Sequence, residues 1–147
     1  MHPILRDFIN TSERLVNILE KSYNKDQYLE TVFLRLTRGF GVENIDNNLY
    51  IELDQAIVNG HQDASVYLIF ISFAISFTCI RKQTERSRVI QSIGFSLSKE
   101  NIYPEVQSYF MISNAILSFY ERKQNECEQC TKASIALINK KSPRFVT

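Results

Sequence analysis

Two cysteines spaced three residues apart are the most reactive side chains that this sequence brings together. Cys127 and Cys130 form a Cys-x-x-Cys pattern, and the one other cysteine is Cys79. Structural zinc sites need four ligands, usually two such pairs or one pair with histidines. His2 and His61 are the only histidines, and neither has a suitable spacing. Residues three apart share one helix face, so the pattern predicts two small packed thiols, with no metal and no cofactor.

Acidic and serine side chains are numerous, but their spacing does not predict a catalytic site. Glu43, Asp46, Glu52 and Asp54 cluster in a polar stretch that a loop and the outer face of a helix explain. The serines lack the Gly-x-Ser-x-Gly turn of hydrolases, and the chain has no glycine-rich phosphate loop. With no catalytic residue to nominate, the sequence predicts a protein that is not an enzyme.

A basic stretch supports an alternative function, that of a helix-turn-helix DNA-binding regulator. It contains Arg81, Lys82, Arg86 and Arg88. The segment SIGFSLS, residues 92–98, resembles the turn of a helix-turn-helix. The recognition helix would cover residues 96–103 and offer Lys99 as its one cation, which leaves few contacts for phosphates or bases. The formal net charge of +1 also argues against nucleic acid as the partner.

The spacing of apolar residues predicts an all-α protein of about seven helices, because no segment shows convincing strand alternation. The predicted helices cover residues 3–23, 26–38, 48–59, 63–83, 84–98, 104–124 and 125–139. Asp63, Thr84 and Asn125 are predicted N-caps, and Pro104 suits a first helical turn. The 147 residues are expected to form a single domain. In it, residues 1–60 hold the N-terminal helices, 63–139 two helix pairs and 140–147 a tail.

The fourth predicted helix raises the question of a membrane. Seventeen residues without a charge run from Ala64 to Ile80. A membrane span needs about 20 predominantly apolar residues, and this run is shorter and includes serine and threonine, so a buried central helix is predicted. The first residues do not have the pattern of a signal peptide. Together with three cysteines, which suit a reducing compartment, this predicts a cytoplasmic protein.

Two nearly identical pentads indicate an internal repeat. RKQTE at residues 81–85 returns as RKQNE at residues 122–126, and an Ala-Ile pair precedes each copy at the same distance. Cations favour the end of one helix, and Thr, Asn and Glu favour the start of the next. Each RKQ is therefore predicted to end one helix of a hairpin. Two helix pairs then repeat with a period of 41, the offset from Arg81 to Arg122.

This layout of long helix, tight bend and helix resembles the tetratricopeptide-repeat class over roughly the last 85 residues. Gly94, Cys130 and Ala133 provide the small residues on the second helix of each pair. The period is longer than in that class, whose repeats span roughly 34 residues. The bulky Leu117 also stands where a small residue is usual. Small helical-repeat proteins of this size resemble the cytosolic chaperones of type III secretion. The resemblance implies a non-enzymatic chaperone or adaptor that holds an amphipathic helix of a partner, such as a secreted subunit or a co-chaperone.

Aromatic and polar side chains on the fourth and sixth predicted helices are the candidate partner-binding residues. They are Phe70, Phe73, Phe77, Tyr109, Ser113 and Tyr120. The first helix of each pair would line the concave face of a stacked array, and an aromatic groove is a common docking place for an amphipathic helix. Interior packing is the other interpretation of the same residues, and the sequence leaves both open.

Overall fold

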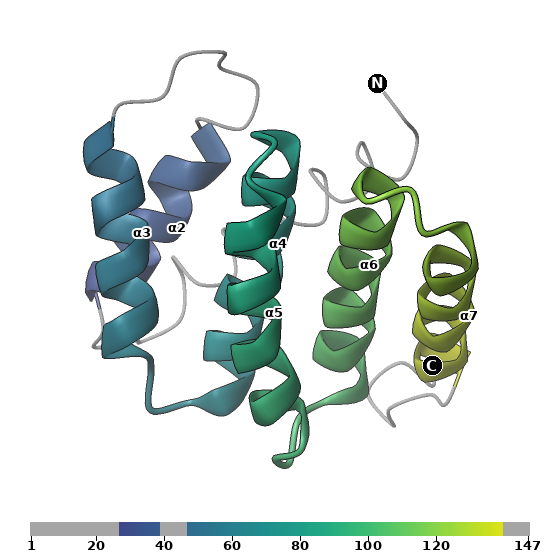
Figure 1. The fold of residues 1–147 in the computed structure, drawn as a ribbon. Helices are drawn as coiled ribbons and strands as arrows, with labels where there is room; N and C mark the ends of the chain where they lie inside the picture. The colour runs from purple at the N-terminus through teal and green to yellow at the C-terminus, as the bar shows by residue number, and fades with distance from the viewer. Residues whose placement is uncertain (1–26, 39–46, 140–147) are drawn as a thin grey trace. The chain divides into compact units, whose positions relative to one another are not determined.

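The structure, a computed structural model, describes residues 27–38 and 47–139. These residues form six α-helices and contain no β-strand, so the all-α class is confirmed for this part of the chain (Figure 1). The helices are α2 (Gln27–Arg38), α3 (Asn47–Asn59), α4 (Ala64–Ile80), α5 (Thr84–Ser98), α6 (Pro104–Tyr120) and α7 (Gln124–Asn139). The helix predicted over residues 3–23, the Asp26 cap and the tail 140–147 lie outside the described residues.

The chain divides into two compact units, Met1–Gln62 and Asp63–Thr147. The single domain expected from the sequence stays a prediction.

In the first unit, α2 packs against α3. The predicted inner face of α2 is buried, and so is most of that of α3: Leu29, Val32, Phe33, Leu36, Leu49, Leu53 and Ala56. Arg35 and Glu52 form an ion pair between the two helices, with 2.6 Å between Nη1 and Oε1. Gly60 ends α3 as predicted, because its φ of 64° is a left-handed conformation that glycine adopts without strain.

The second unit is built around α4. Oδ1 of Asp63 accepts hydrogen bonds from the backbone N–H groups of Ser65, at 2.9 Å, and Val66, at 3.2 Å, which confirms the predicted N-cap. Every residue of α4 from Tyr67 to Cys79 is buried. Among the described residues, no helix combines the length and the hydropathy that crossing a membrane requires.

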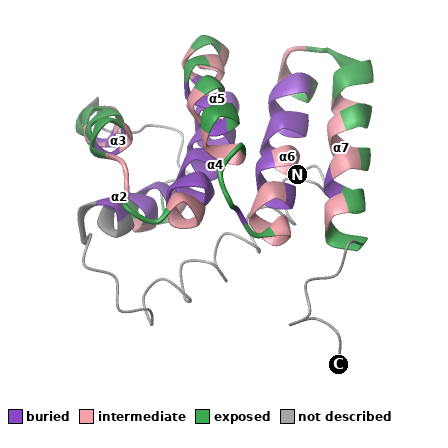
Figure 2. Cartoon of the chain, turned by 90° about the horizontal axis from the view of Figure 1, so that it is seen from below, coloured by how far each residue is buried: buried purple, intermediate pink, exposed green. Residues whose placement is uncertain are grey.

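Two helical hairpins, α4–α5 and α6–α7, make up the second unit. The first helices of the hairpins pack against each other, and α6 also contacts α5 and α7. Figure 2 shows buried residues on α4 and α6 and a largely exposed α7. Ser134 is the one buried residue of α7. Its hydroxyl and that of Ser108 lie 2.7 Å apart, and each donates to the other residue's carbonyl oxygen, at 3.0 and 3.1 Å.

Both hairpins turn in the same way. After α4, the N–H of Lys82 bonds the carbonyl of Cys79 and the N–H of Gln83 bonds that of Thr78, at 2.9 Å each. This is the Schellman pattern, in which the residue after the C-cap is left-handed. Lys82 accordingly has a φ of 61°. The α6–α7 connection repeats the same pair of bonds, with a φ of 59° at Arg122.

The repeat of the hairpins has a different register from the predicted one. The helices α4 and α6 begin at Ala64 and Pro104 and end at Ile80 and Tyr120, so the structural period is 40 and the predicted period of 41 is wrong. The first RKQ, residues 81–83, therefore forms the whole connection between α4 and α5. The second, residues 122–124, starts one position later in its hairpin, so that Arg122 corresponds to Lys82. Both RKQ motifs lie outside the last turns of the first helices. The predicted N-caps Thr84 and Asn125 are also wrong, since both lie inside helices.

The left-handed lysine and arginine lead to a first prediction. Lys82→Gly and Arg122→Gly are each expected to raise the free energy of unfolding by about 0.5–1 kcal/mol, because a side chain with a Cβ is strained in this conformation. Lys99→Gly is the matched control: Lys99 also follows a helix, but its φ is −78°. There, glycine is expected to destabilise the protein. Denaturant unfolding of the full chain measures all three variants, and a loss of stability in the first two would contradict the prediction.

Candidate partner-binding site

The structure places most of the predicted binding residues in the interior. Phe70, Phe73, Phe77, Tyr109 and Ser113 are buried, and Tyr120 is partly buried. The hydroxyl of Ser113 donates to the carbonyl oxygen of Phe110 at 2.7 Å, a bond within its own helix. Their burial favours the interior-packing interpretation that the sequence left open. Their role in partner binding stays a prediction.

The cysteines are not brought into one cluster. Cys127 and Cys130 are partly exposed on α7, and all three cysteines are free thiols. Burial raises the pKa of Cys79 to about 11, and the side-chain hydrogen bond with Ser87, with 3.4 Å between Sγ and Oγ, opposes the rise. Burial and the neighbouring Cys127 also raise the pKa of Cys130. The described residues contain no group of three His, Cys, Asp or Glu side chains suited to a metal ion.

The structure also places the predicted acidic residues and the segment proposed for DNA binding. Glu52 pairs with Arg35, whereas Glu43 and Asp46 lie outside the described residues. The proposed helix-turn-helix turn, residues 92–98, is the continuous last part of α5. No recognition helix forms over residues 96–103, because α5 ends at Ser98 and α6 begins at Pro104. The structural basis of the DNA-binding alternative is therefore wrong.

The interface between the two hairpins has an apolar part centred on Phe110 of α6. Phe110 is almost fully buried, and its ring meets that of Phe95 of α5 edge to face, with 5.3 Å between the centroids. Gly94 of α5 leaves the space for this ring, since a Cβ at Gly94 would lie 2.3 Å from Cε1 of Phe110. Gly94 and Phe95 of the first hairpin therefore form an apolar surface against which Phe110 of the second hairpin packs.

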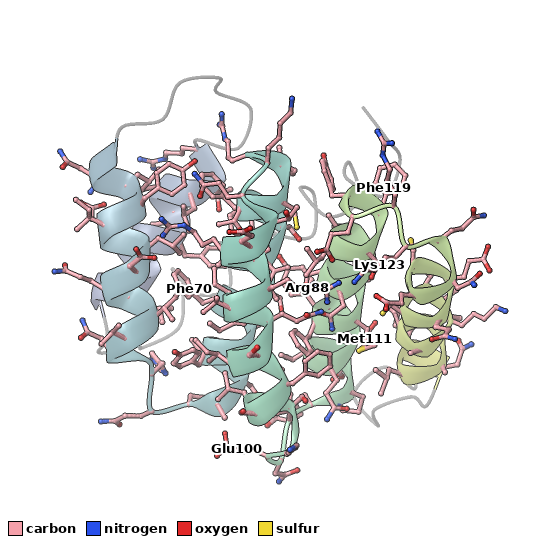
Figure 3. All side chains as sticks on the ribbon, viewed as in Figure 1. Phe70, Arg88, Glu100, Met111, Phe119 and Lys123 are labelled. Atoms are coloured by element: carbon pink, nitrogen blue, oxygen red, sulfur yellow. The ribbon has the colours of Figure 1, made fainter. Side chains whose placement is uncertain are left out.

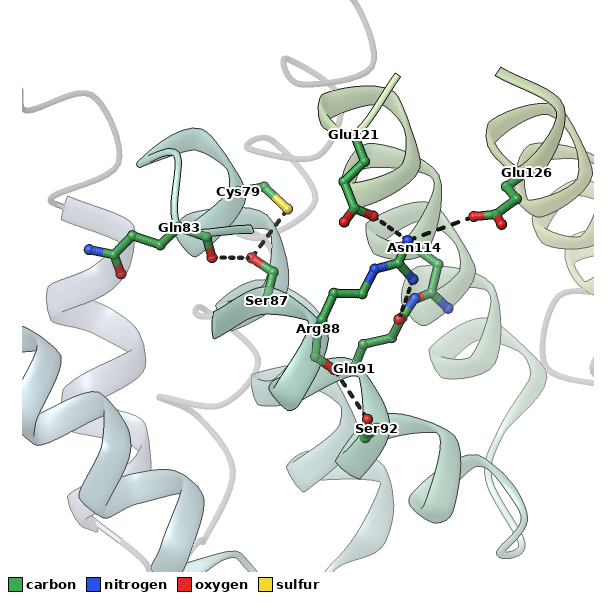
Figure 4. Close-up of polar contacts among 9 residues, drawn as sticks. All are labelled: Cys79, Gln83, Ser87, Arg88, Gln91, Ser92, Asn114, Glu121 and Glu126. Atoms are coloured by element: carbon green, nitrogen blue, oxygen red, sulfur yellow. Dashed lines mark hydrogen bonds and ion pairs between the residues drawn. The ribbon is translucent and has the colours of Figure 1, made fainter. Parts of the chain in front are cut away.

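The same interface has a polar part, shown in Figure 4. Nε2 of Gln91 donates a hydrogen bond to Oδ1 of Asn114 at 3.0 Å. Oε1 of the same glutamine accepts one from Nη1 of Arg88 at 2.9 Å. Arg88 also pairs closely with Glu121, the C-cap of α6, and lies 3.8 Å from Glu126. The pKa of Arg88 is raised, mainly by the hydrogen bond to Glu121. These contacts connect α5 to both helices of the second hairpin.

The structural period of 40 relates the α5 residues of this interface to residues of α7. In the second hairpin, Glu128, Thr131 and Ile135 correspond to Arg88, Gln91 and Phe95, and Phe119 and Ile138 are further exposed apolar residues. We call this set of five residues the open face. Its three large apolar side chains are about half exposed, at 52% for Phe119, 53% for Ile135 and 58% for Ile138. No helix of the described chain occupies this face as α6 occupies the first hairpin (Figures 1 and 3).

The apolar residues of the open face are visible in the sequence, but helical periodicity alone assigns them to a buried face. Ile135 and Ile138 follow the apolar periodicity of the last helix, which predicts that they lie on its inner face. In the structure Ser134 is the buried residue, and the two isoleucines are exposed. The structural period of 40 pairs Ile135 with Phe95, which contacts α6 in the first hairpin. The predicted period of 41 would pair Phe95 with Ala136 instead.

Comparison of the chain with protein-family models, curated proteins and solved structures gives no match. The fold thus defines an all-α protein with two matching helical hairpins, and its open face is the best-supported candidate site.

Proposed function

We propose that this protein is a non-enzymatic protein-binding module of the tetratricopeptide-like kind, a chaperone or adaptor that holds an amphipathic helix of a partner. The observation that carries the proposal is the open face. It includes the α7 counterparts of the α5 residues that contact α6, and its apolar side chains Phe119, Ile135 and Ile138 are about half exposed. The resemblance to type III secretion chaperones suggests a secreted subunit as the partner and the cytoplasm as the place where the two meet.

The energetics of helical arrays support this choice of surface. Repeat proteins bury the face of each repeat on its neighbour. Here the second hairpin exposes two isoleucines and a phenylalanine. Burying one such side chain fully is worth about 1.5–3 kcal/mol, so a helix that covered all three would gain much of the energy that binding needs. The partner then takes the place of a third hairpin's first helix.

The test of this function is capture of the partner by the full chain and by two variants. Ile135→Asp is expected to weaken binding at least about thirtyfold, because burying a carboxylate in an apolar contact is costly and a central contact is worth about 2 kcal/mol. Val89→Asp is the matched control, since Val89 is equally β-branched and 66% exposed on α5, a helix that contributes no residue to the open face.

Captured proteins are identified by mass spectrometry, and the affinity of the identified partner is then titrated against each variant. A partner lost from Ile135→Asp and retained by Val89→Asp supports the proposal. Equal binding by both variants would show that the open face is not the binding site. Enrichment of DNA with strong salt dependence would instead support a nucleic-acid partner.

A further inference from the structure

The ion pair at the interface of the two hairpins indicates what the open face selects. In the first hairpin, α5 offers a cation, Arg88, and the arriving helix α6 offers an anion, Glu121, at its C-cap. The side chain of Arg88 is 33% exposed, so the pair lies at the rim of the interface and not in its centre. Rim charges contribute more to partner choice and orientation than to affinity.

The corresponding charge on the second hairpin has the opposite sign. Glu128 occupies the position of Arg88 one period later, and it is exposed on α7. It accepts a long hydrogen bond from Nε2 of Gln124, at 3.5 Å, and no cation of the described residues forms an ion pair with it. A helix that docked as α6 does would therefore need a cation where α6 has Glu121.

We propose that the open face binds a partner helix whose apolar face covers Phe119, Ile135 and Ile138 and whose last turn carries a lysine or arginine opposite Glu128. This inference rests on the proposed function and adds the charge and the direction of the partner. The helix runs parallel to α6, because α6 itself runs parallel to α4, with both hairpin connections at the same end of the unit (Figure 1). A cation in that last turn is also favourable to the partner helix itself, since the C-terminal end of a helix is negative.

The same charge argues against a second copy of this chain as the occupant. Docked as α6 is docked, a second copy would bring the anion Glu121, the C-cap of its own α6, opposite Glu128. Like charges placed together at an interface are unfavourable. The occupant we infer is therefore a different protein with a basic, amphipathic helix.

The experiment uses two synthetic peptides that cover residues 104–121 of this chain, because that sequence already fits the corresponding face of the first hairpin. One peptide keeps Glu121 and the other carries Glu121→Lys. Binding of each labelled peptide to the full-length protein is measured by fluorescence anisotropy at low ionic strength. The wild-type protein is expected to bind the lysine peptide about threefold more tightly, as a partly exposed ion pair allows, and high salt should reduce that preference.

Charge reversal on the protein makes the test specific. Glu128→Lys is expected to reverse the preference, so that the glutamate peptide binds more tightly. Glu100→Lys makes the same change of charge at an exposed residue of the α5–α6 connection, at the opposite end of the unit from the two hairpin connections (Figures 1 and 3). It should leave the preference as in wild type.

The outcomes separate this inference from the proposed function. If Ile135→Asp abolishes binding but neither peptide is preferred by wild type or by Glu128→Lys, the charge rule is overturned and the binding function stands. If neither peptide binds, or if binding is unaffected by Ile135→Asp, both are overturned. A dimer in sedimentation that Ile135→Asp dissociates would assign the open face to a second copy and overturn the inference of a basic partner.

Discussion

Phe110→Ala is expected to lower the free energy of unfolding by about 3–5 kcal/mol, the largest effect of any substitution considered for this protein. The ring of Phe110 is 1% exposed and lies between α6 and α5, against Gly94 and the edge of Phe95. Its removal leaves a cavity at the interface of the two hairpins, because neither helix backbone can close in on the lost volume. Denaturant unfolding of the full chain, followed by circular dichroism, measures the loss.

Phe119→Ala is the matched control, since it makes the same change on the same helix. Phe119 is 52% exposed, so its loss is expected to cost less than about 1 kcal/mol of stability. It belongs to the open face, however, and the variant should therefore bind the partner helix more weakly. Equal destabilisation by the two variants would show that Phe110 is not the centre of the interface. The pair thus separates folding from binding on a single helix.

Gly94→Ala is expected to have the second large effect on the free energy of unfolding. The sign of this effect is opposite to what helix propensity predicts. Alanine in a helix interior is favoured over glycine by about 1 kcal/mol. At Gly94, however, the new Cβ would lie 2.3 Å from Cε1 and 2.6 Å from Cζ of Phe110, and 3.1 Å from Cγ2 of Ile71. Both neighbours are buried and cannot move away freely. Net destabilisation of about 1–3 kcal/mol is expected, the usual cost of overpacking a core.

Two further variants test the cause of that loss. Ser96→Ala places alanine on the exposed side of the same helix, where it should be neutral or slightly stabilising. Phe110→Leu shortens the ring that meets Gly94, so combining it with Gly94→Ala should cost less than the sum of the two single effects. Additive losses in the double variant, or a gain of stability in Gly94→Ala alone, would contradict the close approach of α5 and α6.

The helices themselves are largely predictable because they depend on local chemistry. Periodic apolar residues indicate the inner face of α2, where Leu29 and Phe33 are buried. Asp63 is recognisable as a cap and Pro104 as a first-turn residue, and both assignments are confirmed. These signals work because a cap or a periodic face depends on residues within one or two turns of the same helix.

The register of the repeat is not predictable in the same way. The RKQ similarity indicates a period of 41, but the helix ends depend on which residue adopts the left-handed conformation. That residue is Lys82 in the first turn and Arg122 in the second, and their side chains carry no local preference for it. A glycine at either position would have marked the turn in the sequence itself.

The candidate site is the least predictable feature. Periodicity shows that Phe73 and Ile135 each belong to an apolar face, but it does not show what covers that face. The answer depends on the neighbours of each helix: α4 is buried on every side from Tyr67 to Cys79, whereas Ser134 is the one buried residue of α7. The predicted binding residues therefore lie mostly in the interior, and two residues predicted on an inner face are exposed.

The hydroxyl pair between Ser108 and Ser134 has a consequence for cooperativity. It holds α7 to α6 through two polar side chains, and water can replace their bonds when the helices separate. Ser134 is the one buried residue of α7, and the other side chains of this helix remain partly or fully exposed to water. Local opening should thus begin at this end of the unit. A partner that bound the open face would raise the cost of the opening, so that the last hairpin would complete its folding as it acquired its ligand.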